Sequence, residues 1–254
     1  GFSGADLQNL MNEGAIFAAR ENRKKVSQYD FIRSIEKVML GPERKSHLLT
    51  KEEKKIAAFH EAGHALVASV LLYADPVHKI SLASRGKAAG YTLKLPIEER
   101  HLYSKLHFLD ELAVFLGGYT AEKLVFNDLT TGAGDDIYRA TAIARDLVVR
   151  YGMSDKMGPV AFEGREEMIF LGRDFNSGKN YSEEVAKEID REVKKIMNDA
   201  NKRAKNVLIK YREALDRIAN ELIEKETIER EEFDGILKSF GIKLKKKKVE
   251  EMHL

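Results

Sequence analysis

The sequence predicts a mainly α-helical protein with a few short β-strands. Apolar residues recur at helical intervals over most of the chain. Rough alternation of apolar and polar residues is confined to two stretches, 77–95 and 159–172. Capping-box spacings of serine and aspartate precede the first two helical runs. Together these observations favour a fold built from packed helices.

The composition limits the classes of function. Of the 254 residues, 33% are charged and 43% are hydrophobic, which is typical of a soluble, folded protein. The 43 Lys and Arg residues nearly balance the 41 Asp and Glu residues, so the net charge of +2 provides no long-range field for nucleic acid. Because the chain has no cysteine, a bound metal must be held by His, Asp or Glu. The longest apolar run, 65–74, is about half of the roughly 20 residues that cross a bilayer.

A small helical unit is expected at the N-terminus, over residues 1–46. Ser3 and Ser27 each begin a capping box, which predicts two helices. The first helix is expected to end near Arg20, and Gly41 followed by proline stops the second. A unit of this size is too small to be an enzyme by itself.

Residues 47–240 are expected to form the larger domain. Its first helix is buried and is terminated by Asp75-Pro76. A basic tail, 241–254, is expected to be mobile and solvated. The expected segments are helices at 54–73, 103–126, 135–150, 182–224 with a break near Asn206, and 231–240, strands at 77–82 and 91–95, and two short strand-like runs within 159–172.

One motif on the 54–73 helix carries chemistry. His60-Glu61-Ala62-Gly63-His64 is an HExxH motif, whose i, i+4 spacing puts two imidazoles one turn apart on one helix face, where both can reach one Zn²⁺. Glu61 lies beside them and is placed to take a proton from a zinc-activated water. The alternative is a pair of ordinary polar histidines. It is disfavoured because the motif lies in an apolar helix, where imidazoles without partners are costly.

A catalytic zinc site needs a third protein ligand and leaves one position open to water. The metzincin pattern requires Gly and His at positions 67 and 70, and valine at both positions excludes it. The segment 130–136 is the most informative, because a Thr/Gly-rich loop that delivers a carboxylate onto the first turn of a helix fixes its direction and favours its charged form. Capping that helix is the alternative role. The candidate ligands left open are His78, His101, His107, Glu111, Glu122, Asp135 and Asp136.

Longer motifs accompany HExxH in order along the chain. They include Phe59-His60-Glu61-Ala62-Gly63-His64-Ala65, Leu109-Asp110-Glu111-Leu112-Ala113-Val114 with Gly117-Gly118 and Ala121-Glu122, Thr130-Thr131-Gly132-Ala133 followed by Asp136-Ile137, Gly90-Tyr91-Thr92, and Tyr151-Gly152-Met153-Ser154. Together they resemble the peptidase domain of the FtsH family, ATP-dependent zinc proteases that are usually membrane-anchored and hexameric. The segment from Gly1 to Gly41 resembles the end of that family's AAA ATPase module, its small helical subdomain.

The resemblance implies a set of site residues. One zinc ion per chain would be held by His60, His64 and Asp136, with Glu61 as the general base. Glu122 matches a family carboxylate that supports the site, and it is the alternative third ligand. The implied activity is hydrolysis of unfolded or misfolded polypeptides that an associated AAA ATPase ring delivers.

The expected partners follow from the same comparison and from the strand pattern. An extended substrate is expected to pair with the strand edge at Gly90, Tyr91 and Thr92, where an ordinary hairpin packed on the core is the alternative. The resemblance implies a homo-hexamer and no nucleic-acid partner. In the full-length protein it implies a place on the cytoplasmic face of a cell membrane, through an N-terminal anchor that this soluble fragment lacks.

The chain departs from the family in one large respect. It contains no GxxxxGK[ST] sequence, so no residue is assigned to ATP binding, and ATP is expected to act only through an upstream AAA module. The chain is therefore expected to be a C-terminal fragment. The alternative function is a non-catalytic hexamerisation and docking module in which the HExxH motif is structural. Structural zinc sites normally have four protein ligands, and here only three convincing candidates exist.

Overall fold

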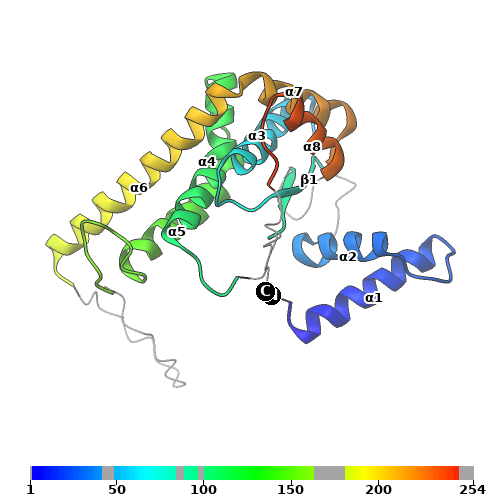
Figure 1. Ribbon diagram of the computed structural model, residues 1–254, viewed down its shortest axis with the longest axis horizontal. Helices are drawn as coiled ribbons and strands as arrows, with labels where there is room; N and C mark the ends of the chain where they lie inside the picture. The colour runs from blue at the N-terminus through cyan, green and yellow to red at the C-terminus, as the bar shows by residue number, and fades with distance from the viewer. Residues whose placement is uncertain (1, 42–48, 84–88, 97–99, 163–180, 246–254) are drawn as a thin grey trace, which may run out of the picture.

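Helices form most of the structure, as the sequence predicts, and a small sheet lies beside them (Figure 1). The computed structural model describes residues 2–41, 49–83, 89–96, 100–162 and 181–245. The elements are α1 (Gly4–Arg20), α2 (Gln28–Leu40), α3 (Lys51–Val70), β1 (Val77–Ser81), β2 (Tyr91–Lys94), α4 (Lys105–Phe126), a 3-10 turn (Thr131–Ala133), α5 (Gly134–Val149), α6 (Glu183–Lys210), α7 (Arg212–Lys225), β3 (Thr227–Glu229) and α8 (Arg230–Ser239).

α1 and α2 pack against each other at one side of the molecule (Figure 1). Both predicted capping boxes are present. The side chains of Ser3 and Ser27 accept hydrogen bonds from backbone N–H groups in the first turns of these helices, as capping residues do. Gly41 ends α2 with a φ of +84°, a conformation that residues with a Cβ rarely adopt. The two N-terminal helices predicted from the sequence are thus confirmed.

α2 contacts the sheet through one buried carboxylate, that of Glu36. The Tyr91 hydroxyl donates to its Oε2 at 3.1 Å, and the Lys79 ammonium lies 2.9 Å from its Oε1. These contacts join the N-terminal helices to both β2 and β1. The predicted domain boundary at residues 46 and 47 lies outside the described residues.

α3 is the central helix of the core. It starts at a capping box between Thr50 and Glu53, and all of its residues from 58 to 69 are buried. α4, α6, α7 and β1 surround it. A helix covered on all sides is expected to be apolar around its circumference. The polar side chains of the HExxH motif therefore lie in the protein interior, where each needs a polar partner.

The sheet has three antiparallel strands in the order β2-β1-β3. The strands predicted at 77–82 and 91–95 correspond to β1 and β2. β3 was not predicted, because a strand of three residues is too short to show alternation; it pairs with β1 through Ile228 opposite Ile80. Of the two strand-like runs predicted within 159–172, residues 159–162 contain no strand, and the remainder lies outside the described residues.

The predicted break near Asn206 is wrong by several residues. α6 continues through this position, and the helix is interrupted at Tyr211, whose φ of −114° and ψ of 40° are not helical. Asn206 is exposed, so its poor helix propensity costs only a fraction of about 1 kcal/mol, while Val207 and Leu208 beside it are buried in the core. Burial of its apolar neighbours thus outweighs the local preference of asparagine.

The first residues of the predicted C-terminal tail pack on the domain. Ile242 is buried in the main core, and the Lys245 ammonium donates to the backbone carbonyls of Ala68, at 2.6 Å, and Ala74. Residues 246–254 lie outside the described part of the chain. No described helix combines the length and the apolar character that crossing a bilayer requires.

Candidate metal centre

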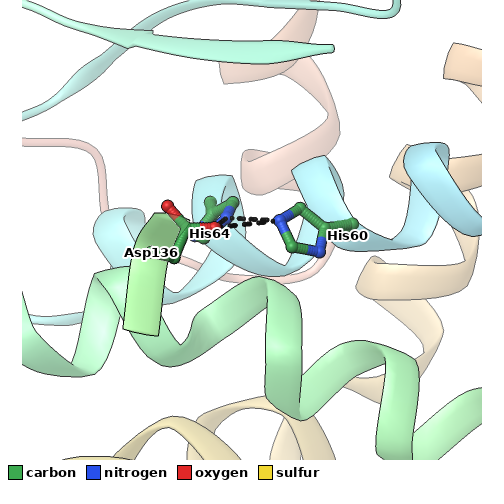
Figure 2. Close-up of side chains that lie close together, drawn as sticks. All are labelled: His60, His64 and Asp136. Atoms are coloured by element: carbon green, nitrogen blue, oxygen red, sulfur yellow. Dashed lines mark hydrogen bonds and ion pairs between the residues drawn. The ribbon is translucent and has the colours of Figure 1, made fainter. Parts of the chain in front are cut away.

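α3 brings the two histidines of the motif together. The Nε2 atoms of His60 and His64 lie 3.0 Å apart, and the side chains are largely buried, with the residues 9% and 8% exposed. Figure 2 shows both rings turned toward one point in front of α3. This is the arrangement that the i, i+4 spacing predicts.

Asp136, in the first turn of α5, completes a three-residue group. Its Oδ2 atom lies 3.1 Å from Nε2 of His60 and 3.1 Å from Nε2 of His64 (Figure 2). Burial raises the pKa of this carboxyl, but its close contacts with the two imidazoles outweigh that effect and hold the pKa well below its usual range. Among the described residues, this is the one group of three or more ligating side chains close enough to share a metal ion.

The other nitrogen of each imidazole is occupied. Nδ1–H of His60 donates to Oε1 of Glu122 at 2.7 Å, and Nδ1–H of His64 donates to the backbone carbonyl of Val114 at 2.7 Å. Glu122 is itself buried, and its Oε2 accepts from the backbone N–H of Thr130 at 2.8 Å. These bonds select the tautomers whose Nε2 lone pairs face the shared point, the position between Nε2 of His60, Nε2 of His64 and Oδ2 of Asp136. Protein metal sites orient histidine ligands in this way.

The three atoms around the shared point need a cation between them. Two imidazole lone pairs and a carboxylate oxygen converge on it, and without a metal a proton has to separate them. Burial lowers the pKa of His60, but hydrogen bonds to Asp136 and Glu122 outweigh this and raise it to about 10. A metal ion would replace that proton.

The donor set fits zinc. It offers two imidazole nitrogens and one carboxylate oxygen, a combination that catalytic zinc sites use. The three donor atoms are separated by 3.0, 3.1 and 3.1 Å. Ligands about 2.0–2.1 Å from a tetrahedral zinc lie roughly 3.3 Å apart, so only a small adjustment would be needed.

Glycines let α4 approach the motif. A Cβ on Gly63 of α3 would lie 2.5 Å from the carbonyl oxygen of Gly117 of α4, so the two helices cross with their backbones in contact. A Cβ on the next residue, Gly118, would lie 2.5 Å from Nε2 of His60. The Gly-Gly pair therefore makes room for both the helix crossing and the ring of a ligating histidine.

Glu61, the middle residue of the motif, lies against the sheet. It is 7% exposed, and its Oε2 accepts a hydrogen bond from the Thr92 hydroxyl at 2.6 Å. A Cβ on Gly90 would lie 3.2 Å from its Oε1. Two of the three predicted substrate-strand residues, Gly90 and Thr92, thus border this carboxylate, while the third, Tyr91, contacts Glu36.

The other candidate ligands lie elsewhere. His107 donates to the backbone carbonyl of Tyr73, Glu111 pairs with Lys94, and exposed Asp135 pairs with Arg139. None of these, nor His78 or His101, joins a ligating group within the described ranges. Glu122, the alternative third ligand, contacts Nδ1 of His60, on the side of the ring away from the shared point.

Three features of the site were not predicted from the sequence: the space at Gly118, the hydrogen bond from Thr92 to Glu61, and the carbonyl of Val114 as partner of His64. A Gly-Gly pair inside an apolar helix is a detectable signal of close packing. The other two depend on how separate elements meet, and no local pattern marks them.

Comparison with known proteins places the chain in a family. Residues 47–236 match Peptidase family M41, and residues 1–33 match the AAA+ lid domain. ATP-dependent zinc metalloprotease FtsH of Thermotoga maritima is 52% identical over 238 residues, which are 93% of this chain and 39% of that protein. FtsH 1 of Sphaerobacter thermophilus is 50% identical over 236 residues (93% and 36%), and FtsH of Rubrobacter xylanophilus is 42% identical over 242 residues (95% and 37%).

The chain spans less than two-fifths of the length of these curated relatives. The family match nevertheless covers most of the chain, and it includes the HExxH motif and Asp136. The chain therefore belongs to Peptidase family M41.

Proposed function

We propose that the chain is a zinc-dependent endopeptidase that hydrolyses peptide bonds of unfolded or misfolded proteins. One observation carries the proposal: Nε2 of His60, Nε2 of His64 and Oδ2 of Asp136 converge within 3.1 Å of one another, while hydrogen bonds tie the remaining imidazole nitrogens away from them. The names of the relatives, all zinc metalloproteases, support it.

His60, His64 and Asp136 would hold the metal. Zn²⁺, when bound, supplies a Lewis acid that polarises a peptide carbonyl and makes a water molecule acidic enough to attack at neutral pH. Glu122 and the Val114 carbonyl keep the two imidazoles in the ligating tautomer. Three protein donors leave a position for water, as catalytic zinc sites do, which disfavours the non-catalytic docking module.

Glu61 would be the general base. Its carboxylate is next to the first histidine ligand and is held on the sheet side of α3 by Thr92. It would accept a proton from the attacking water and then donate that proton to the leaving amide nitrogen, so that no net proton change remains on the side chain. Such positioned proton transfer typically contributes about 10²- to 10⁴-fold to the rate.

β2 would bind the substrate. It is an edge of the described sheet, because its partner there is β1 on one side only. An extended polypeptide can pair with such an edge through backbone hydrogen bonds, which read little sequence and suit a protease of unfolded chains. Pairing along Gly90, Tyr91 and Thr92 would place the peptide next to Glu61, whose carboxylate Gly90 and Thr92 border.

The assembly would be a homo-hexamer linked to an AAA ATPase ring. The AAA+ lid match at the N-terminus supports the link, and the resemblance to FtsH supports the ring. ATP would be bound by an AAA module outside this chain, and that module would deliver the substrate. An anchor outside this chain would hold the full-length protein at the cytoplasmic face of a cell membrane.

The test measures zinc content by elemental analysis and cleavage of an unfolded, fluorescently labelled casein. We expect about one zinc per chain, and cleavage that a chelator abolishes. Glu61→Gln should keep the zinc and lose cleavage, whereas Glu52→Gln, an exposed residue of the same helix, should change neither. Wild-type cleavage by Glu61→Gln would refute the general-base role. Stoichiometric zinc without cleavage of casein would mean that cleavage requires the AAA ring, whereas absence of zinc would overturn the metalloprotease and favour the docking module.

A further inference from the structure

The edge strand β2 and the residue before it lie against the side chain of Glu61. The Thr92 hydroxyl donates to Oε2 at 2.6 Å and lies 3.3 Å from the backbone carbonyl oxygen of the same residue. Two residues earlier, Gly90 lies where a side chain has no room. A Cβ there would lie 2.9 Å from the backbone carbonyl oxygen of Ser81, 3.0 Å from Cγ of Glu61 and 3.2 Å from its Oε1. Thr92 of β2 and Gly90, the residue before the strand, therefore both lie against the Glu61 side chain.

This contact is the main polar support of a buried charge. Glu61 is 7% exposed, and within the described part of the chain Thr92 is the one side chain that donates a hydrogen bond to it. Burying a carboxylate without such a donor has a large free-energy cost of desolvation. The sheet holds Thr92 in place, because its backbone pairs with Ile80 of β1, a fully buried core residue.

The contact also makes the two carboxylate oxygens of Glu61 different from each other. Oε2 is used by Thr92, and Oε1 makes no hydrogen bond to any described residue. A general base needs one oxygen within hydrogen-bond reach of the water it deprotonates, and a fixed orientation of the group. Holding Oε2 on the strand leaves Oε1 for that water.

We infer that Thr92 is a positioning residue for the general base, acting through its hydroxyl on Glu61, with Gly90 providing the space. The inference rests on the proposed function, because it assumes that Glu61 is the base. The same strand would then bind the substrate through its backbone and orient the base through a side chain. Removing the hydroxyl alone should lower kcat and leave KM unchanged.

The first test is Thr92→Val, which keeps the shape of the side chain and the strand backbone but removes the donor. We expect kcat to fall about 10- to 100-fold, as for loss of a hydrogen bond to a charged group, with KM within about twofold and zinc content unchanged. Thr92→Ser restores a hydroxyl and should recover most of kcat. Thr227→Val is the matched control, because Thr227 is a threonine of the opposite edge strand whose hydroxyl contacts Ser81 rather than the site.

A second test does not depend on activity. The thermal midpoints of wild type, Thr92→Val, Glu61→Ala and the double variant form a cycle that measures the coupling of the two side chains. We expect Thr92→Val to lower the midpoint in the wild-type background and to have a smaller effect once the carboxylate has been removed, when only the contact with the backbone carbonyl of residue 61 remains. Additive shifts would mean that the hydrogen bond is not made in solution.

The outcomes separate this inference from the proposed function. If Glu61→Gln is inactive and Thr92→Val keeps the wild-type kcat, the positioning role is wrong and the base remains. If Thr92→Ser loses as much activity as Thr92→Val, the hydroxyl is not the active feature and the inference fails. If Glu61→Gln is fully active, the base assignment fails, whatever the thermal cycle shows.

Discussion

Gly118 on α4 faces the imidazole of His60 so closely that a Cβ at this glycine would lie 2.5 Å from Nε2 and 2.6 Å from Nδ1. The ring cannot move away from this methyl position, because its Nδ1–H is hydrogen-bonded to buried Glu122 and its Nε2 faces Asp136. One glycine on a neighbouring helix thus controls the position of a candidate metal ligand.

Gly118→Ala should therefore weaken zinc binding strongly. The added methyl group must displace the ring or separate α3 from α4, and overpacking of this kind typically costs about 1–3 kcal/mol of stability. Zinc affinity, measured by competition with a fluorescent chelator, should fall at least about tenfold, by analogy with the loss of supporting residues in zinc sites.

The matched control is Gly235→Ala in α8. An added Cβ there would have no atom within 4 Å, and the residue is exposed, so the substitution should raise the helix stability by up to about 1 kcal/mol and leave zinc affinity unchanged. Unchanged zinc affinity in Gly118→Ala would show that the site adjusts freely, against the close packing described above.

Asp136→Asn should abolish tight zinc binding. The substitution removes the anionic donor and leaves the two imidazoles, so affinity should fall by more than the roughly 10- to 100-fold typical of a supporting residue. Asp135→Asn tests the alternative on the same helix turn. Its side chain is exposed and pairs with Arg139, so zinc content and casein cleavage should stay at wild-type levels. Loss of zinc in Asp135→Asn instead would overturn the ligand set.

The local parts of the site could be predicted from sequence, and the parts that depend on packing could not. Because i, i+4 spacing in a helix determines that two side chains share a face, His60 and His64 could be paired in advance. For the third ligand, the Thr/Gly-rich loop favoured Asp135 or Asp136 and left other candidates open, and the resemblance selected Asp136.

Other features depend on how elements meet. Thr92 is paired with Glu61 because β2 lies over α3, and no pattern in either segment carries that information. β3 is stabilised by pairing with β1 rather than by its own three residues. At Asn206 the local propensity was misleading, since burial of its neighbours keeps the helix intact.

Glu122→Gln should reduce zinc affinity about 10- to 100-fold without removing a ligand. The glutamate accepts two hydrogen bonds, from Nδ1–H of His60 and from the backbone N–H of Thr130. A glutamine can accept only through its single oxygen, so its amide group would face one of these donors. Glu111→Gln on the same helix is the control, because Glu111 pairs with Lys94 and should not affect zinc. Equal zinc affinity in both variants would refute the supporting role of Glu122.

Lys245 should make stability depend on pH in the alkaline range. Burial lowers the pKa of its ammonium from 10.5 to about 8, and the carboxylates of Asp110 and Asp75 offset only part of this. Between these two pH values the unfolded chain binds more protons at this residue than the folded chain, so its contribution to the free energy of unfolding rises with pH. Below about pH 8 the cost of burying the charge is fully present.

The measurement compares thermal midpoints of wild type and Lys245→Met from pH 7.5 to 10. Wild type should gain relative to the variant as pH rises, since only wild type can relieve the cost by losing a proton. Lys243→Met, which removes an exposed lysine two residues away, is the matched control. A Lys245→Met difference from wild type that does not change with pH would mean that the ammonium does not bind the carbonyls of Ala68 and Ala74 in solution.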